Sequence, residues 1–182
     1  YPQNLKKEKM KIDLFSIPVF IGNIDVNKIK FKTDYKLQKT WLSKTDSNFH
    51  DKNMLTDESL RYLLDTIVSI LNEEIRSEYN ISLIEIWKNV YKHKDYQEEH
   101  LHPGAQFSFV IYKKVNSSNT VFLASHYFIS QYSWKDEFIY KTKFEPQLKN
   151  NQIIIFPSFL THHVKPLSNS ETIAGNLKFE YK

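Results

Sequence analysis

The sequence predicts a single mainly β or α+β domain, and three observations lead to this fold class. Short segments with apolar residues at alternate positions recur after residue 80, a pattern typical of a β-sandwich or β-barrel. One long segment with helical periodicity precedes them, as expected for a helix that supports a barrel core. The 182 residues include 13 Phe and 11 Tyr, and both types favour strands. A chain of this length is expected to form one domain, residues 1–182.

The first part of the chain predicts one strand and one helix. Residues 12–24 are expected to form an early strand at a sheet edge, because a proline interrupts them. Residues 31–55 are polar and irregular, with Trp41 as their one anchor. The helix is expected over Asp57–Tyr79, because its apolar residues recur at intervals of three and four. Thr56 is a suitable N-cap, and we expect the helix to pack on a sheet.

After Asn80 the hydrophobic pattern changes to a period of two residues, which predicts strands. Within the later part of the chain, Ile153–Phe156 is apolar throughout and therefore predicts a strand buried on both faces. The expected strands are residues 82–91, 96–102, 107–114, 121–129, 137–145, 152–156 and 171–181.

The composition excludes several classes of protein. Cysteine is absent, which rules out disulfides, thiolate metal sites and cysteine nucleophiles and fits a reducing compartment. No apolar run approaches the length of a membrane-spanning helix. The net charge is +4 with scattered lysines, so no nucleic-acid partner is expected. Only 3 glycines occur, no phosphate-binding loop is present, and Ser158 lacks the glycines of a hydrolase elbow.

Two histidine-containing segments form the candidate functional site. His100 and His102 end a predicted strand, where residues two apart point to the same face. His162 follows the buried strand about sixty residues later, so a barrel that closes on itself would bring the three rings together. Neutral imidazole is the commonest metal ligand. A facial set of three ligands with open positions is the geometry of non-haem iron oxygenases, although their usual set includes a carboxylate.

Alternatives exist at three points of this candidate site. His162 and His163 are adjacent, and in an extended backbone only one of them can face inward. Glu98 shares the parity of His100, so it is either a ligand in place of one histidine or a solvated carboxylate at the rim. The histidines outside these motifs are expected to be structural or exposed: His126, His50 and His93.

Several short motifs occur together in one order. They are Leu14–Val19, Trp87-Lys88-Asn89, Gln97–Gly104, Phe107–Tyr112, Phe156–Pro166 and Ile173–Asn176. These motifs resemble the 2-oxoglutarate and Fe(II)-dependent oxygenase family of bacteria and phages, a branch close to the prolyl-hydroxylase-like enzymes. The similarity extends over nearly the whole chain, and the segment from Phe156 to His162 is its most specific part.

The resemblance implies a double-stranded β-helix, also called a jelly-roll or cupin-like barrel. It implies that His100, His102 and His162 hold Fe(II), and that His163 points away. It also implies oxidative decarboxylation of 2-oxoglutarate with dioxygen, coupled to hydroxylation of a C–H bond in a small molecule or protein side chain. A cytoplasmic location is expected, in the host if the chain is phage-encoded, with no membrane or nucleic-acid partner.

The co-substrate site departs from the family pattern. Such oxygenases commonly carry an arginine shortly before the last Asn, where it grips a carboxylate of 2-oxoglutarate, but no arginine follows Arg76. The chain would then be a metalloenzyme that holds 2-oxoglutarate differently, a three-histidine metalloenzyme that does not use it, or a cupin-like metal-binding module. The lysines that could replace the arginine are Lys113, Lys143, Lys165 and Lys178. The residues expected to contact the co-substrate are Asn89, Ser108, Tyr112, Thr172 and Asn176.

Overall fold

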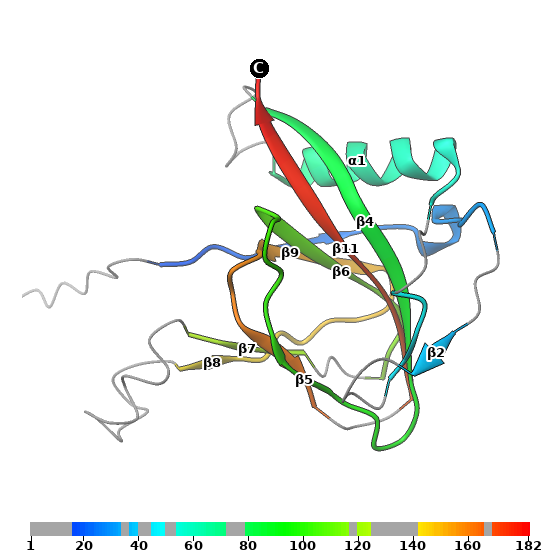
Figure 1. The fold of residues 1–182 in the computed structure, drawn as a ribbon, viewed down its shortest axis with the longest axis vertical. Helices are drawn as coiled ribbons and strands as arrows, with labels where there is room; N and C mark the ends of the chain where they lie inside the picture. The colour runs from blue at the N-terminus through cyan, green and yellow to red at the C-terminus, as the bar shows by residue number, and fades with distance from the viewer. Residues whose placement is uncertain are drawn as a thin grey trace, which may run out of the picture.

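Two antiparallel β-sheets face each other in the computed structural model, as Figure 1 shows. The structure describes residues 16–33, 37–39, 45–49, 54–71, 79–116, 120–124, 142–165 and 169–182. The larger sheet has the order β1-β9-β6-β11-β4-β3-β2, and the smaller has the order β5-β10-β7-β8. This arrangement is that of a double-stranded β-helix, and it confirms the mainly β (α+β) class.

The two sheets contain the following strands. Those of the larger sheet are β1 (Phe20–Asn23), β2 (Gln38–Lys39), β3 (Asp46–Ser47), β4 (Tyr79–Tyr91), β6 (Phe107–Lys114), β9 (Gln152–Pro157) and β11 (Ser170–Tyr181). Those of the smaller sheet are β5 (Gln97–His100), β7 (Thr120–Leu123), β8 (Lys143–Phe144) and β10 (His162–Val164). A short 3₁₀-helix, η1, covers Val26–Lys28.

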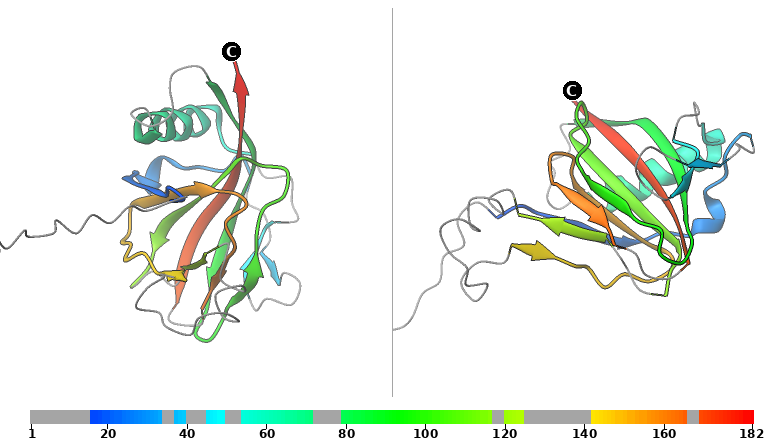
Figure 2. Two further views of the ribbon diagram at one scale, coloured as in Figure 1. Left: turned by 90° about the vertical axis from the view of Figure 1, so that its left-hand side faces the viewer. Right: turned by 60° about the horizontal axis from the view of Figure 1, so that its bottom comes forward.

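The helix α1 (Asp57–Leu71) covers the face of the larger sheet that lies away from the smaller sheet (Figure 2). Its buried stripe of Leu63, Ile67 and Leu71 joins one apolar cluster with side chains of the sheet. The hydroxyl of Thr56 accepts a hydrogen bond from the Ser59 backbone N–H at 3.3 Å, which confirms the predicted cap. The sheet is therefore buried on this face by the helix and on the other face by the smaller sheet.

This double burial explains the continuous apolar run of β9. Ile153 and Ile155 belong to the cluster beneath α1. Ile154 and Phe156 belong to a second cluster between the two sheets. Since successive side chains of a strand point to opposite faces, an apolar side chain is required at every position.

Several predicted elements are confirmed, and the bounds of others differ. The strand predicted at 107–114 has the same bounds, and those predicted at 152–156 and 171–181 differ by one residue. The predicted helix end at Tyr79 is wrong, because Tyr79 begins β4, where it pairs with Tyr181.

Other differences concern short or polar strands. Within the described residues the early strand covers Phe20–Asn23, and the predicted part 12–15 lies outside them. Strand β5 ends at His100, two residues before the predicted end. Residues 31–55, expected to be irregular, contain β2 and β3, which have only two residues each. The three-residue strand β10 was also not predicted. The strands predicted at 121–129 and 137–145 correspond to β7 and β8, and 125–141 lie outside the described residues.

No helix in the described part of the chain is both long enough and apolar enough to span a lipid bilayer.

Gly175 of β11 is expected to be required for the packing of the larger sheet. A Cβ atom at this position would lie 2.7 Å from the backbone carbonyl oxygen of Glu85 and 2.6 Å from the buried ring of Phe109. Because neither neighbour can move freely, Gly175→Ala is expected to lower the free energy of unfolding by about 1–3 kcal/mol, measured by urea denaturation. The matched control is Gly22→Ala, for which the three atoms nearest to the new Cβ all belong to the side chain of Ile70 and none to the backbone. Equal losses in both variants would contradict this explanation.

Candidate metal centre

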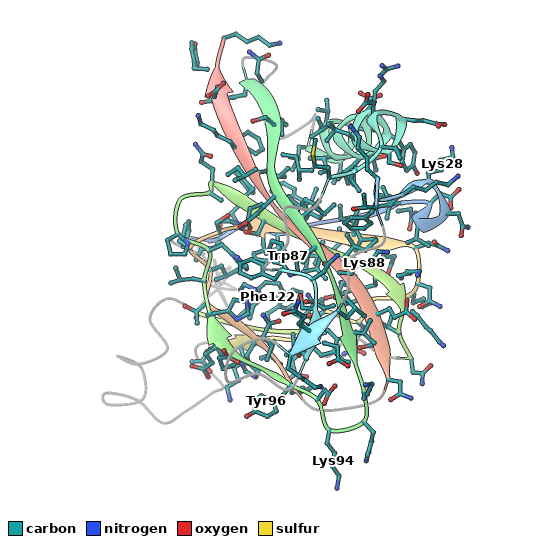
Figure 3. All side chains as sticks on the ribbon, turned by 45° about the vertical axis from the view of Figure 1, so that its right-hand side comes forward. Lys28, Trp87, Lys88, Lys94, Tyr96 and Phe122 are labelled. Atoms are coloured by element: carbon teal, nitrogen blue, oxygen red, sulfur yellow. The ribbon has the colours of Figure 1, made fainter. Side chains whose placement is uncertain are left out.

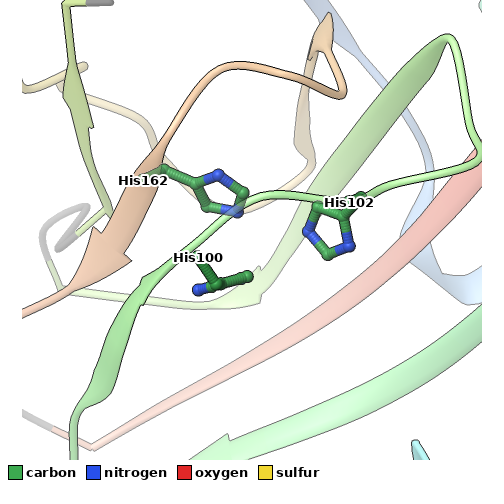
Figure 4. Close-up of side chains that lie close together, drawn as sticks. All are labelled: His100, His102 and His162. Atoms are coloured by element: carbon green, nitrogen blue, oxygen red, sulfur yellow. The ribbon is translucent and has the colours of Figure 1, made fainter.

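The fold brings together the three histidines that the sequence singles out. Strand β10 pairs antiparallel with β5, and in this register His162 lies opposite His100. His102 follows β5, and its backbone N–H donates to the carbonyl of Ser158 at 3.0 Å, which ties it to the chain before β10. The ligand nitrogens of all three rings lie within 4.8 Å of one another (Figure 4). This is close enough for the three rings to bind one ion.

Backbone carbonyls fix the orientation of two of the rings. Nδ1 of His100 lies 2.7 Å from the carbonyl oxygen of Glu98, and Nδ1 of His162 lies 2.9 Å from that of Leu160. Since a carbonyl oxygen only accepts, each Nδ1 must carry the proton and donate it. The Nε2 lone pair is then free, which is the tautomer that a metal-binding histidine needs.

The third ring has a different environment. Nδ1 of His102 lies 3.4 Å from the amide nitrogen of Asn176, at the outer limit of a hydrogen bond. The ring also lies against Trp87, with 5.7 Å between the ring centroids. Asn176 is itself fixed, because its amide donates to Glu85 at 2.6 Å and accepts from the Ser108 hydroxyl at 2.7 Å. The orientation of His102 therefore depends on this polar network rather than on a backbone carbonyl.

Burial keeps the three rings uncharged. Desolvation lowers the pKa of His100, lowers that of His102 to about 4, and lowers that of His162 well below its usual value. The neighbouring rings lower the pKa values of His102 and His162 further, since a second positive charge would repel the first. All three imidazoles are therefore neutral at pH 7, as metal ligation requires.

A small cavity lies beside the histidines between the two sheets, and we name it the inner cavity. Its volume of about 20 Å³ corresponds to roughly one water molecule. Its lining has no lysine, arginine, aspartate or glutamate among the described residues. The polar groups of its lining besides the histidines and Trp87 are Asn89, Tyr91, Gln97, Thr120 and Thr172.

Hydroxyl groups gather at the inner cavity. The Tyr91 hydroxyl donates to Gln97 at 3.0 Å, and burial raises the pKa of Tyr91, so this phenol stays protonated. The Tyr112 hydroxyl lies 2.7 Å from that of Thr120, and both side chains are buried. Thr172 is 5% exposed and also hydrogen-bonds to Tyr91. The hydroxyl groups in and next to the lining of the inner cavity are therefore neutral hydrogen-bonding groups.

A second, larger cavity of about 250 Å³ also lies beside the histidines, and we name it the outer cavity. Both His100 and His102 line it, together with Trp87 and Asn176. It differs from the inner cavity because two carboxylate residues, Glu85 and Glu98, lie in its lining.

None of the four lysines proposed from the sequence lines either cavity. Lys113 pairs with Glu171 at 3.0 Å, and Lys178 pairs with Glu180 at 2.6 Å, all at the surface. Lys165 pairs with Glu145, and Lys143 is exposed. The missing arginine is therefore not replaced by any of these candidates.

The other predicted residues lie at distinct places. Asn89 and Thr172 line the inner cavity, and Asn89 and Asn176 line the outer one. Ser108 lines neither, and its hydroxyl supports Asn176 and contacts Ser158 at 2.8 Å. Their role in co-substrate binding, and that of Tyr112, stays a prediction.

The alternatives among the histidines and Glu98 are resolved by geometry. His163 faces away from the cluster, with Nδ1 3.9 Å from Glu99, and His93 is exposed as expected. Glu98 is not part of the converging group of ligand atoms. Its side chain is half-buried at the edge of the outer cavity, with Oε2 shielded from solvent, and its place at the rim stays a prediction. His50 and His126 lie outside the described residues.

Sequence reasoning did not identify Glu85, Tyr91 and Gln97. A signal for Glu85 was present, because Glu85, Trp87 and Asn89 alternate along β4 and therefore point to one face of the strand. Tyr91 continues the same alternation.

The donor set fits a divalent transition metal. Three neutral imidazoles suit iron, zinc, copper and nickel alike. Three protein ligands also leave coordination positions for small molecules. The histidines alone therefore support a catalytic type of metal site without selecting the metal.

Comparisons with known proteins show which metal the similar oxygenases use. Residues 85–173, which carry all three histidines, match the model of the family described as "Putative 2OG-Fe(II) oxygenase". Oxygenases of this family use Fe(II), 2-oxoglutarate and dioxygen. The similarity proposed from the sequence motifs is thereby confirmed. No curated protein sequence matches the chain.

Solved structures share the fold. A prolyl-4-hydroxylase of Pseudomonas putida matches with a TM-score of 0.53 and 11% identity, over 78% of this chain and 76% of that one. HygX of Streptomyces hygroscopicus, with nickel, 2-oxoglutarate and hygromycin B bound, matches with a TM-score of 0.54 and 8% identity, over 81% of this chain and 73% of that one. At these identities the similarity shows the double-stranded β-helix alone.

Removal of the distal histidine is expected to abolish metal binding. His162→Ala leaves two imidazoles, which rarely hold a labile divalent ion, whereas His163→Ala leaves the set of three intact. Isothermal titration of the full chain with Ni(II) measures both. Unchanged affinity in His162→Ala, or loss in His163→Ala, would show that the assignment of the neighbouring histidines is wrong.

Proposed function

Because residues 85–173 match the 2OG-Fe(II) oxygenase family, we propose that this protein is a non-haem Fe(II)- and 2-oxoglutarate-dependent dioxygenase that hydroxylates a C–H bond. The convergence of His100, His102 and His162 carries this proposal. The substrate is a small molecule or a protein side chain, and residues 1–182 act as a single domain. The cytoplasm remains the proposed location.

The three histidines would hold Fe(II), and for His100 and His162 the ligand atom would be Nε2, which their hydrogen bonds to backbone carbonyls leave free. When bound, the ferrous ion supplies the activation of dioxygen, coupled to decarboxylation of 2-oxoglutarate. The chain supplies the orientation of the rings, through the carbonyls of Glu98 and Leu160. The buried surroundings keep the rings unprotonated and limit access of water.

The linings of the two cavities differ in charge, which favours a different ligand in each of them. 2-Oxoglutarate is a dianion, and the carboxylates of Glu85 and Glu98 would repel it from the outer cavity. The inner cavity has no carboxylate and offers N–H and O–H donors. We therefore assign the co-substrate to the inner side of the metal site. Since that cavity has a volume of about 20 Å³, side chains around it must move when the co-substrate binds.

Hydroxyl groups would replace the missing guanidinium in this assignment. Thr172 and the Tyr112–Thr120 pair are buried and can donate to the distal carboxylate. A neutral donor holds a carboxylate less strongly than a bidentate arginine does. The affinity for 2-oxoglutarate is therefore expected to be lower than in oxygenases with the arginine.

A second candidate function is a three-histidine metalloenzyme that does not use 2-oxoglutarate. Two observations favour it: the ligand set has no carboxylate, and no described cation lines the inner cavity. The same two observations also support a cupin-like metal-binding module that catalyses no reaction.

Anaerobic titration tests the main proposal. Addition of 2-oxoglutarate to the Fe(II)-loaded chain is expected to produce a weak visible charge-transfer band, and addition of dioxygen is expected to release succinate. The His162→Ala variant is the control and should show neither. If wild-type protein binds Fe(II) tightly but produces no band and no succinate, the second candidate function is favoured and the main proposal is rejected.

The hydroxyl of Thr172 is expected to contribute to co-substrate binding. Thr172→Val keeps the shape but removes the donor, and loss of a hydrogen bond to a charged group costs about 1.5–3 kcal/mol. The concentration of 2-oxoglutarate that half-saturates the charge-transfer band should therefore rise about tenfold or more. The affinity for Fe(II) should not change. Thr142→Val is the control, because Thr142 is in the lining of neither cavity. Equal half-saturation in the wild type and Thr172→Val would place the co-substrate elsewhere.

A further inference from the structure

We propose that the outer cavity binds a substrate through a positively charged nitrogen group, a protonated amine or a guanidinium, with Glu98 as its main acceptor. This inference rests on the proposed function and specifies the substrate class of that site.

The position of the outer cavity is that of a substrate site. His100 and His102 form part of its wall, so a ligand within it lies beside the proposed metal. Its volume of about 250 Å³ is slightly below the range of about 300–1,000 Å³ for typical ligand pockets. A small molecule or one long side chain would fill it.

The charge of the outer cavity is negative. Glu85 and Glu98 are in its lining, and no lysine or arginine lines it among the described residues. Neither carboxylate takes part in an ion pair within the described part of the chain. Lys88 follows Trp87 on β4 but points to the other face, where its Nζ lies 4.6 Å from the Phe31 ring centroid (Figure 3).

Glu98 has an acceptor atom that the described chain leaves unused. Its Oε2 is shielded from solvent and has no hydrogen-bond partner. Such an atom is costly, because it has lost water without gaining a donor. Glu98 is not in the converging metal-ligand group. Because Glu98 lines the cavity, rotation of its carboxylate would bring this oxygen to a donor of a ligand there.

Glu85, in contrast, already has a hydrogen-bond partner, because its Oε1 accepts a hydrogen bond from the side-chain amide of Asn176 at 2.6 Å. It therefore contributes negative charge to the cavity while also supporting the network beside His102. Glu98, which has no such partner, is the better contact for a cation.

The aromatic wall of the cavity also suits a cationic ligand. Trp87 and Phe49 both line it, and their rings meet edge to face with centroids 4.9 Å apart. An aromatic face attracts an ammonium or guanidinium group and packs against its alkyl chain. An amine or guanidinium on a short aliphatic chain therefore matches both the carboxylate and the aromatic parts of the cavity.

The test compares two probes of the same shape and different charge. n-Butylguanidinium is positively charged, and n-butylurea is its neutral counterpart. Isothermal titration of each into the Ni(II)-loaded full chain is expected to show at least about tenfold tighter binding of the cation, the value of one hydrogen bond to a charged group. Equal affinities, or tighter binding of butanoate than of the cation, would overturn the proposal.

Two matched variants locate the contact. Glu98→Gln removes the charge and keeps the shape, so the preference for the cation should fall about tenfold while the affinity for n-butylurea stays the same. Glu99→Gln removes the same charge from the exposed next residue of β5 and should keep the preference. Equal effects in both variants would attribute the preference to general surface charge and contradict the role of Glu98.

Two further probes separate the possible sources of the cation. Free L-arginine represents a small-molecule substrate, and Nα-acetyl-L-arginine amide represents a side chain within a protein. The probe that binds more tightly identifies the source of the cation. If neither probe binds, the proposal is contradicted.

The outcome is separable from that of the proposed function. These titrations measure binding with Ni(II) and do not require turnover. If the charge-transfer band appears without selectivity for the cation, only the present inference fails. If the cation binds selectively but no band appears, the oxygenase assignment fails and the cation site stands.

Discussion

The candidate metal centre depends on one antiparallel strand pairing, that of β5 with β10. This pairing places His100 opposite His162, although about sixty residues separate them in the chain. Both strands are short. The chain after β5 and the chain before β10 are held together by a backbone hydrogen bond, in which the N–H of His102 donates to the carbonyl oxygen of Ser158. The larger sheet and α1 form the main core behind this pair. The bulk of the fold thus serves as a rigid support for two short strands.

The charges around the histidines are separated between the two sides. The inner side has hydroxyl and amide groups and no described charge, whereas the outer side has Glu85 and Glu98. An anionic co-substrate and a cationic substrate would then occupy different cavities beside one centre, although both linings include Trp87, Asn89 and Gln97. The two carboxylates would also attract each cationic substrate that reaches the cavity mouth.

The sequence predicted the larger part of the fold, because long strands have a clear hydrophobic period. Strand 107–114 is an example, with the same bounds in the structure. Short elements were missed, such as β10, since three residues are too few to show a period.

In the site, the histidine trio was predictable from motifs. The state of Glu98 was not, because parity gives the face of a strand but not which neighbours shield an oxygen. Glu85 acts through Asn176, and such a tertiary contact leaves no local pattern.

The neutral ligand set has a consequence for the electronics of the centre. Three uncharged imidazoles leave a bound ferrous ion with its full double charge, whereas a carboxylate ligand would cancel half of it. A centre with greater positive charge resists further loss of an electron, so its reduction potential is higher and slow autoxidation in air is disfavoured. The same charge strengthens the attraction for any anion that coordinates directly. If 2-oxoglutarate coordinates the metal, this attraction would partly compensate for the lack of a lysine or arginine among the described residues of the inner cavity.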